Sequence, residues 1–498
     1  MEAARPAPSG PRAGSLRPVS RGEPVAESRR WVALLVHLPM AALVAAYALR
    51  FSLLSVNVHN GYGTPAFDMA IPDQAIWLMS RFHAPFSTVM GRNFFGDHTS
   101  FILALLVPLF WVYPHTAALL VVQSMLLAAA AIPIYLYARH RLGSTVLATL
   151  LAASFLLNPA LQNGNLEQFH VECFTVLLLS VALFAALENK GWLLGLSIVG
   201  LLLCKEDAAL LVVPLGVWVA WRQNRAWGIR IIVLALGWTL FASEVVIKSL
   251  VGVVNVHNGR IPFGGAGGAL RTLVRRPGTF ANYVSSDGRL FYVWQMVFSA
   301  GLVLLAAPEV AAIAILTLAT NVLASFNYEH QILFHYSMPL VPILTFGTVF
   351  AVGALRTTKS RQVATGAVAV CSLWACVLWG LAPFSVHQYP HLSPSSPEVA
   401  NINRVLKSLP ADAVVTAYYP YVSHIDHRTR IYMWPNPFRA QYWDRFQQEG
   451  QRLPFADQIR WLVLPTGLTG TDASLLASIA PSYHLVQQDG DVALYQHN

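Results

Sequence analysis

FDMAIPDQAIWLMSRFHAPFSTVMGRNFFGDH, residues 67–98, directly follows the first long apolar run of the chain. Only 11% of the whole chain is charged, yet this segment contains carboxylates and histidines at Asp68, Asp73, His83, Asp97 and His98. Ionisable side chains are costly near a bilayer, and membrane proteins keep them mainly where they use them. The segment is therefore predicted to carry function.

The composition predicts a polytopic helical membrane protein. Of the 498 residues 55% are apolar, and apolar runs recur at about 20 residues, the length that crosses a bilayer. The formal net charge of +9 comes largely from arginines at the ends of these runs, where they set orientation, so no nucleic-acid partner is expected. The four cysteines lie in or beside apolar runs without metal-ligand spacing, and they predict no disulfide scaffold.

Charge bias gives the expected topology. Residues 1–30 are rich in Pro, Ala, Ser, Gly and Arg and are predicted to form a disordered cytoplasmic tail. Two arginines place the start of the first helix, Trp31 to about Val56, in the cytoplasm, so that residues 67–98 lie outside. The next run, FILALLVPLFWVYPH, is short for a crossing and predicts an interfacial or re-entrant helix. The same rules give about 11 crossings in a membrane domain of residues 31–385.

Acidic and basic groups separate in this topology. The basic runs RHR, RQNRAWGIR and RTTKSR fall on the cytoplasmic side. The acids and histidines cluster on the outer side, at Asp68 to His98, at Glu167, His170 and Glu172, at Glu206 and Asp207, and at Glu329, His330 and His335. Charges gathered at one end of a helical bundle suggest a shared, water-accessible cavity.

The composition changes near residue 385. Residues 386–498 contain no spanning run, and the proline-rich linker HQYPHLSPSSP marks the boundary. A helical pattern over Pro397–Leu409 precedes the β-like runs AVVTAYY, RIYMW, IRWLVLP, YHLVQQ and VALYQ. They predict a small soluble α/β domain, held outside the membrane by the last helix. The order of its strands does not follow from the runs.

Five motifs carry a resemblance to known proteins. FDMAIPDQAIW, GDH at 96–98, NLEQFHVE at 165–172, KED at 205–207 and FHYSMPLVP at 334–342 together resemble a family of predicted bacterial membrane proteins with no assigned activity. That family is similar to the GT-C class of integral-membrane glycosyltransferases, and the resemblance covers roughly residues 50–380. It implies an all-α, GT-C-like fold in the plasma membrane of a bacterium.

The resemblance also implies a reaction. Enzymes of the GT-C class face outward, among membrane lipids, and pass a sugar from a polyprenyl-phosphate carrier to an acceptor, here an envelope glycan, lipid or protein. An acidic residue in their first outer loop serves as base or metal ligand, and Asp68 occupies that place. Many members have adjacent acids at this point whereas this chain has Asp68 and Met69, which leaves open whether a divalent metal ion is required.

The chemistry requires the same residue types. An alcohol that attacks an anomeric carbon needs a carboxylate within hydrogen-bond reach to accept its proton. Asp68 is the first candidate base and Asp73 the second, although Asp73 could instead serve the amino end of a helix near Pro72. The charge of the departing phosphate needs cationic groups or a metal. Candidate metal ligands are Asp68, His98 and Glu172.

Further polar groups are candidate substrate contacts. His98 could donate to phosphate, or it could be a polar anchor at the interface. Glu167 and His170 would share one helical face, and they could bind substrate or a divalent ion. Glu206 and Asp207 interrupt two apolar helices, where charge is costly, and are predicted to contact substrate hydroxyls.

Arginines and a late histidine complete the candidate set. The predicted outer loop Asn255–Arg289 contains Arg260, Arg271, Arg275 and Arg276 on a side that should be poor in basic residues. Arginine forks match phosphate oxygens and could bind a lipid-linked donor, and attraction to anionic headgroups is the alternative. His335 could line a lipid-carrier channel or anchor a helix end.

Two functions are consistent with this pattern. One is a GT-C-like glycosyltransferase, and the other is a transporter or flippase of a lipid-linked envelope precursor, in which the same charges form the translocation path. Transporters usually show internal repeats and sites near the bilayer midplane. The absence of an evident sequence repeat and the outer placement of the acids favour the enzyme.

Overall fold

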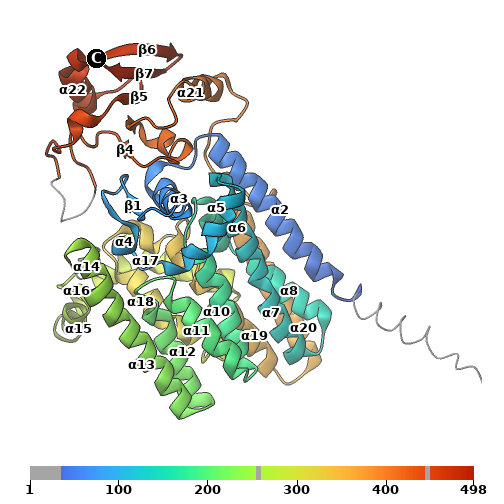
Figure 1. Ribbon diagram of the computed structural model, residues 1–498. Helices are drawn as coiled ribbons and strands as arrows, with labels where there is room; N and C mark the ends of the chain where they lie inside the picture. The colour runs from blue at the N-terminus through green and yellow to red at the C-terminus, as the bar shows by residue number, and fades with distance from the viewer. Residues whose placement is uncertain (1–34, 254–258, 443–448) are drawn as a thin grey trace, which may run out of the picture.

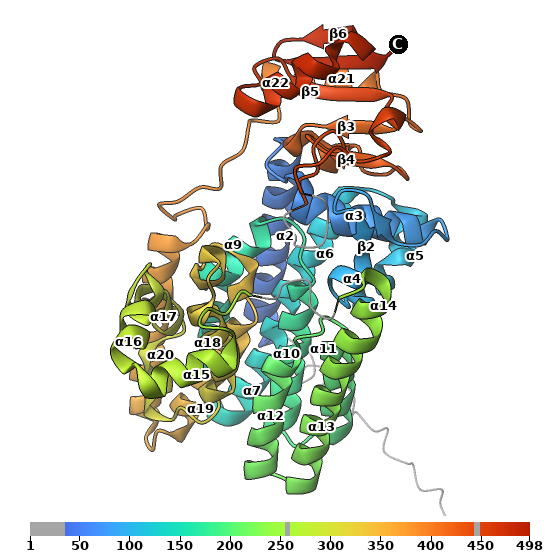
Figure 2. The same cartoon turned by 90° about the vertical axis from the view of Figure 1, so that its left-hand side faces the viewer.

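The computed structural model describes residues 35–253, 259–442 and 449–498. The predicted tail, residues 1–30, lies outside the described residues. Figure 1 shows a helical bundle with a small sheet domain at one end, and Figure 2 shows the same two parts from the side.

Among the described residues, five helical segments are long and apolar enough to cross a membrane. They are α2 (Leu38–Asn60), α6 and α7 (Thr116–Ala129 and Ala131–Leu142), α13, η2 and α14 (Arg225–Phe241, Ala242–Ile247 and Lys248–Val251), η6 and α19 (His335–Ser337 and Leu340–Ala354), and α20 (Thr358–Trp379). A sixth is the pair α8 (Thr145–Leu156) and α9 (Pro159–Leu166), bent by 46°.

Shorter apolar helices complete the bundle. They are α10 (Glu172–Leu187), α11 (Gly191–Leu202), α12 (Ala209–Arg222), and η4 with α18 (Ala311–Ala314 and Ile315–Leu323). Their 12 to 16 residues are fewer than the usual length of a crossing. The count of about 11 crossings therefore stays a prediction, while the mostly helical, membrane-type architecture is confirmed.

The segment after α2 forms short elements next to the sheet domain. They are α3 (Ala66–Ser80), the antiparallel pair β1 (Phe86–Ser87) and β2 (Arg92–Asn93), α4 (Phe94–Asp97), η1 (Phe101–Leu106) and α5 (Val107–Val112). The short run predicted as an interfacial helix corresponds to η1 and α5. The segment predicted as a loop at Asn255–Arg289 contains two helices, α15 (Ala266–Arg275) and α16 (Pro277–Ser285). The elements that follow are α17 (Arg289–Ser299), η3 (Leu302–Ala306) and η5 (Asn327–His330).

Local sequence signals set several helix ends. Asn158 caps α9 by accepting a hydrogen bond from the backbone N–H of Ala160 at 3.0 Å, and a proline occupies the first helical position. Thr357 and Ser360 form a reciprocal capping box at the start of α20. Gly143 ends α7 with φ of 65°, in the left-handed region that glycine adopts without strain.

The C-terminal domain is the predicted α/β unit. Helix α21 (Pro397–Lys407) precedes a sheet of order β4-β3-β5-β7-β6, with η7 (Tyr419–His424), η8 (Ala456–Gln458), α22 (Gly470–Ile479) and η9 (Ala480–Ser482) in its connections. Its strands are β3 (Val415–Ala417), β4 (Ile431–Met433), β5 (Trp461–Pro465), β6 (Tyr483–Asp489) and β7 (Val492–His497). β3 is parallel to β4 and β5, and β7 is antiparallel to β5 and β6. Each of the five β-like runs contains one strand.

The C-terminal domain packs on α3 and the β1–β2 turn (Figure 2). The Gln74 side chain donates to the backbone carbonyl of Arg428 at 3.0 Å. Thr88 Oγ1 accepts from the backbone N–H of Ile431 at 3.0 Å and donates to the Ile431 carbonyl at 2.5 Å. These bonds join residues more than 340 positions apart, so the segment after α2 is the platform on which the domain sits.

The basic runs meet at the far end of the bundle. His140 and Arg141, with Arg222 and Glu188, line a polar hollow of about 440 Å³. Figures 1 and 2 show the α7–α8, α12–α13 and α19–α20 turns at the end opposite the sheet domain. The predicted separation of basic runs from the C-terminal domain is thus present in the fold.

Candidate functional site

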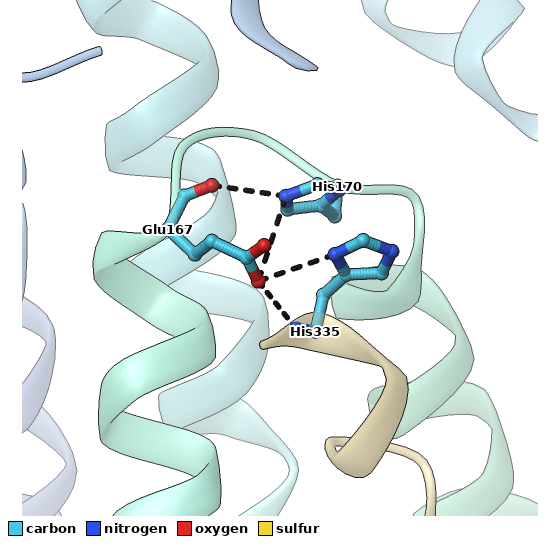
Figure 3. Close-up of side chains that lie close together, drawn as sticks. All are labelled: Glu167, His170 and His335. Atoms are coloured by element: carbon cyan, nitrogen blue, oxygen red, sulfur yellow. Dashed lines mark hydrogen bonds and ion pairs between the residues drawn. The ribbon is translucent and has the colours of Figure 1, made fainter. Parts of the chain in front are cut away.

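Glu167, His170 and His335, called here the Glu167 cluster, lie together where α9 ends (Figure 3). Residues 167–171 form the turn between α9 and α10. Within it Gln168 has φ of 86°, in the left-handed region that few residues other than glycine adopt, and this reverses the chain. The turn brings His170 back beside Glu167, and η6 supplies His335 from the start of the α19 segment.

The three side chains are buried and in contact. Glu167 Oε2 accepts the backbone N–H of His335 and lies 3.2 Å from its ring Nδ1. His170 Nε2 lies 2.9 Å from the Glu167 carbonyl oxygen and 3.9 Å from Oε2, and the two imidazoles stack with centroids 3.7 Å apart. One donor atom from each residue lies within 4.8 Å of the others. One carboxylate with two imidazoles is a donor set that suits a divalent transition metal.

Asp68 lies close enough to act electrostatically on this cluster. It is half-buried in the first turn of α3. Burial raises the pKa of Glu167 to about 8, the positive charge of His170 opposes the rise, and the negative charge of Asp68 adds to it. Burial, followed by the same Asp68 charge, raises the pKa of Tyr419 to about 12. Asp68 therefore lies within electrostatic range of both the Glu167 cluster and Tyr419 of the C-terminal domain.

A second network joins the 205–207 turn to the outer segment. Lys205 Nζ lies 2.5 Å from Glu172 Oε1, at the start of α10. Glu206 Oε1 lies 2.8 Å from His98 Nδ1, and Glu206 Oε2 accepts the backbone N–H of Thr99 at 3.1 Å. Glu172 and His98, both expected as metal ligands, are thus engaged with other partners.

Arg260 is the outer-loop arginine that reaches this region. Its Nη1 lies 3.1 Å from Glu329 Oε1, and its guanidinium is 5.1 Å from the Phe326 ring and 5.9 Å from the Tyr336 ring. Tyr336 directly follows His335, so Arg260 approaches the cluster from the side of η6.

Comparison with known proteins gives a family and a fold. Residues 62–462 match the family described as "Predicted membrane protein (DUF2079)". The chain belongs to this family. It is also similar to ArnT from Cupriavidus metallidurans, in the crystal structure bound to undecaprenyl phosphate, with TM-score 0.54 and 12% identity over 91% of this chain and 97% of that one. The apo ArnT structure gives TM-score 0.54 and 12% identity over 94% and 98%. No curated protein matches the sequence.

These matches confirm the expected family. They also confirm its likeness to the GT-C class at the level of the fold. At 12% sequence identity the similarity to ArnT shows a similar fold and does not establish a shared activity.

In this DUF2079 protein the two candidate bases face different ways. Asp73 follows Asp68 by five residues, which rotates it by about 140° around α3. It is fully buried, with its Oδ1 3.0 Å from Nε2 of His427 in the C-terminal domain. Asp73 is therefore part of the contact between the two domains, away from the Glu167 cluster.

The sequence predicted part of this site. Asp68, Glu167, His170 and His335 were all candidates, and the structure brings the last three into contact, with Asp68 within electrostatic range. The compact set of donors is the Glu167 cluster and differs from the expected set of metal ligands, Asp68, His98 and Glu172. Asp207 is exposed beside Lys205, and Arg275 and Arg276 are exposed at the end of α15. Their binding roles stay predictions.

Sequence reasoning missed two contributors to the DUF2079 site, Lys205 and Tyr419, and did not single out a third, Arg260. Lys205 has the pattern of a lysine that snorkels to the interface, and Arg260 was one of several loop arginines, so neither stood out. Tyr419 comes from the C-terminal domain, and no spacing in the sequence predicts that it approaches Asp68.

Proposed function

We propose that this protein transfers a sugar from a polyprenyl-phosphate donor to an acceptor of the cell envelope, on the extracytoplasmic face. The observation that carries the proposal is the buried Glu167 cluster, which the charge of Asp68 reaches and beside which the cations Lys205 and Arg260 are held by Glu172 and Glu329. The fold gives support, because the similar ArnT was solved with undecaprenyl phosphate, which is a polyprenyl phosphate.

Asp68 is the proposed base. As the acceptor oxygen bonds to the anomeric carbon, its proton passes to the Asp68 carboxylate. The bond between the sugar and the carrier phosphate breaks, and the phosphate keeps the electron pair. Half-burial lets Asp68 meet a substrate while water is partly excluded.

The Glu167 cluster fits a divalent cation. Glu167, His170 and His335 would hold it, because their donor atoms are close together and buried. Such an ion, when bound, would offset charge on the departing phosphate. The raised pKa of Glu167 is consistent with a carboxylate that lacks a full positive partner of its own.

Two protein cations could also meet the phosphate. Lys205 is held by Glu172 at 2.5 Å, and Arg260 lies against aromatic rings beside the cluster. An arginine fork matches phosphate oxygens, and a lysine supplies a point charge. Glu206 orients His98 and Thr99, and the exposed Asp207 is proposed to contact sugar hydroxyls.

The test offers purified protein in lipid a panel of polyprenyl-phosphate sugars with envelope acceptors. We expect transfer by the wild type and a loss of about 100-fold or more in Asp68→Asn, the usual contribution of a general base. Asp412→Asn is the matched control, since Asp412 is exposed in the C-terminal domain, and it should keep full activity.

Two outcomes would contradict the proposal. Undiminished transfer by Asp68→Asn would remove Asp68 as the base. No transfer by the wild type from any donor, together with movement of a lipid-linked precursor across liposomes, would replace the enzyme by a transporter or flippase.

A further inference from the structure

A second cluster of metal-binding side chains lies between the bundle and the C-terminal domain. Asp73 comes from α3, whereas Asp426 and His427 come from the turn after η7. His427 Nε2 lies 3.0 Å from Asp73 Oδ1, and one donor atom from each of the three residues lies within 4.8 Å of the others. Asp73 and His427 are 354 positions apart, so the cluster connects the two domains.

Both carboxylates are buried and incompletely paired. Asp73 is 0% exposed and Asp426 is 1% exposed. The Oδ2 atom of each is buried without a hydrogen-bond partner among the described residues. An ionised carboxylate in this position is strongly unfavourable unless a cation or a proton compensates it.

Arg428, the arginine nearest in sequence, acts on Asp426 through its charge but, among the described residues, makes no ion pair with it. Arg428 follows Asp426 by two residues, but within the described part of the chain it forms no ion pair with either carboxylate of the cluster. Its guanidinium donates to the backbone carbonyls of Ile425 at 2.5 Å and of Pro410 and Ala413 at 3.3 Å. Arg428 thus holds the turn in place. The carboxylates of Asp73 and Asp426 stay close to each other without an ion pair to Arg428.

The histidine is oriented and accessible. Its ring stacks on Trp77 with centroids 5.9 Å apart and lies 5.7 Å from the Phe110 ring. The His427 side chain is 25% exposed, which gives an ion a route from solvent. Two ligand atoms at about 2.1 Å from one tetrahedral ion stand about 3.4 Å apart, so the 3.0 Å between Nε2 and Oδ1 needs to widen by only a few tenths of an ångström. An imidazole with two carboxylates favours Zn²⁺ or Mn²⁺ over Mg²⁺ and Ca²⁺, which take oxygen ligands.

We propose that Asp73, Asp426 and His427 form a site for a divalent transition-metal ion that fastens the C-terminal domain to α3. The ion would neutralise the two facing carboxylates and add a coordinate link to the hydrogen bonds of Gln74 and Thr88. This inference stands independently of the proposed glycosyl transfer, because no residue of the second cluster belongs to the Glu167 cluster or contacts it.

The experiment measures zinc binding by the full-length protein in detergent. The protein is stripped with a chelator, dialysed against Zn²⁺, and analysed for metal per chain and for unfolding temperature. We expect Asp426→Asn and His427→Gln to bind one Zn²⁺ fewer than the wild type, whatever the Glu167 cluster binds. His427→Cys, which keeps a zinc ligand, should retain that ion. The control His391→Gln removes an exposed histidine of the linker, bonded to Asn57 at 2.8 Å, and should match the wild type.

Docking gives the second readout. Zn²⁺ should raise the unfolding temperature of the stripped wild type and slow proteolytic cleavage of the linker at 386–396, and it should do neither in His427→Gln. Equal zinc content in the wild type, Asp426→Asn and His427→Gln would overturn the proposal. If those variants do not fold, the test uses the wild type alone. An unfolding temperature of the wild type that changes neither on chelation nor on addition of Zn²⁺ would also overturn the proposal.

Discussion

His98 and Glu206 form a hydrogen-bonded pair whose charge depends on pH. The atoms Nδ1 and Oε1 are 2.8 Å apart, and the side chains are 24% and 16% exposed. Burial lowers the pKa of His98, but the negative charge of Glu206, with that of Asp97, outweighs burial, so the pKa lies above its usual 6.5. A histidine with a raised pKa in the folded state contributes stability that is complete below pH 6.5. That stability is lost as the pH rises through the folded-state pKa.

We therefore expect the unfolding temperature of the wild type in detergent to fall as the pH rises above 6.5. His98→Gln should lower the free energy of unfolding by about 1.5–3 kcal/mol below that pH, the range for a hydrogen bond to a charged group, and should flatten the slope. Thermal unfolding across the pH range checks both. His83→Gln, an exposed histidine of the same segment, should keep the wild-type slope. Identical slopes in the wild type and His98→Gln would show that the pair is not ionised.

For single residues, the sequence predicts which side chains gather better than it predicts which side chains pair with each other. Charge in an apolar chain marked Glu167, His170 and His335, which the fold brings together, since one end of the bundle collects them. It could not assign Lys205 to Glu172, because an ion pair depends on distances of a few ångströms between different helices. Asp73 was the second candidate base after Asp68, and its rotation around α3 gives it different surroundings from those of Asp68.

Among the helices, α12 and α13 pack closely through glycines. A Cβ on Gly228 of α13 would overlap the backbone nitrogen of Ala220 and lie 2.5 Å from the carbonyl oxygen of Gly216, both in α12. Backbone atoms cannot move aside as the end of a side chain can. Small residues at such contacts let helices in membranes approach each other.

Gly228→Ala should therefore destabilise the bundle by about 1–3 kcal/mol, the usual cost of overpacking. Gly237 lies on the same helix, and no atom lies within 4 Å of the position that a Cβ would take there. Gly237→Ala should accordingly be neutral or stabilise by up to about 1 kcal/mol through helix propensity. Unfolding temperature and monodispersity in detergent compare the two. Equal unfolding temperatures for both variants would mean that the helices separate without cost.

The elements themselves were partly predictable. Each β-like run contains a strand, because alternation and β-branched residues are local signals. The strand order was not predictable, since β7 inserts between β5 and β6 through pairings that the runs do not specify. Helices of 12 to 16 residues, such as α10 to α12, gave no clear count of crossings because apolar length alone does not separate a span from a buried helix.

At the scale of the molecule, the C-terminal domain and the segment after α2 form one unit. Ser423 of η7 donates to the carbonyl of Thr64, and the His424 ring stacks on His59 of α2 with centroids 4.1 Å apart. Sequence reasoning predicted the domain but not its docking, because contacts between residues 359 positions apart leave no periodic pattern. This docking also brings Tyr419 toward Asp68.

The orientation of the whole molecule is the last prediction. Basic runs gather at the end opposite the C-terminal domain, and the excess of Lys and Arg marks the cytoplasmic side. In a cysteine-free background, a membrane-impermeant maleimide should label Ser395→Cys in the linker on intact cells. It should label Lys359→Cys, at the start of α20, only after permeabilisation, since both positions are exposed. The reverse labelling would place Asp68 and the Glu167 cluster in the cytoplasm and would exclude an outward-facing lipid-linked donor.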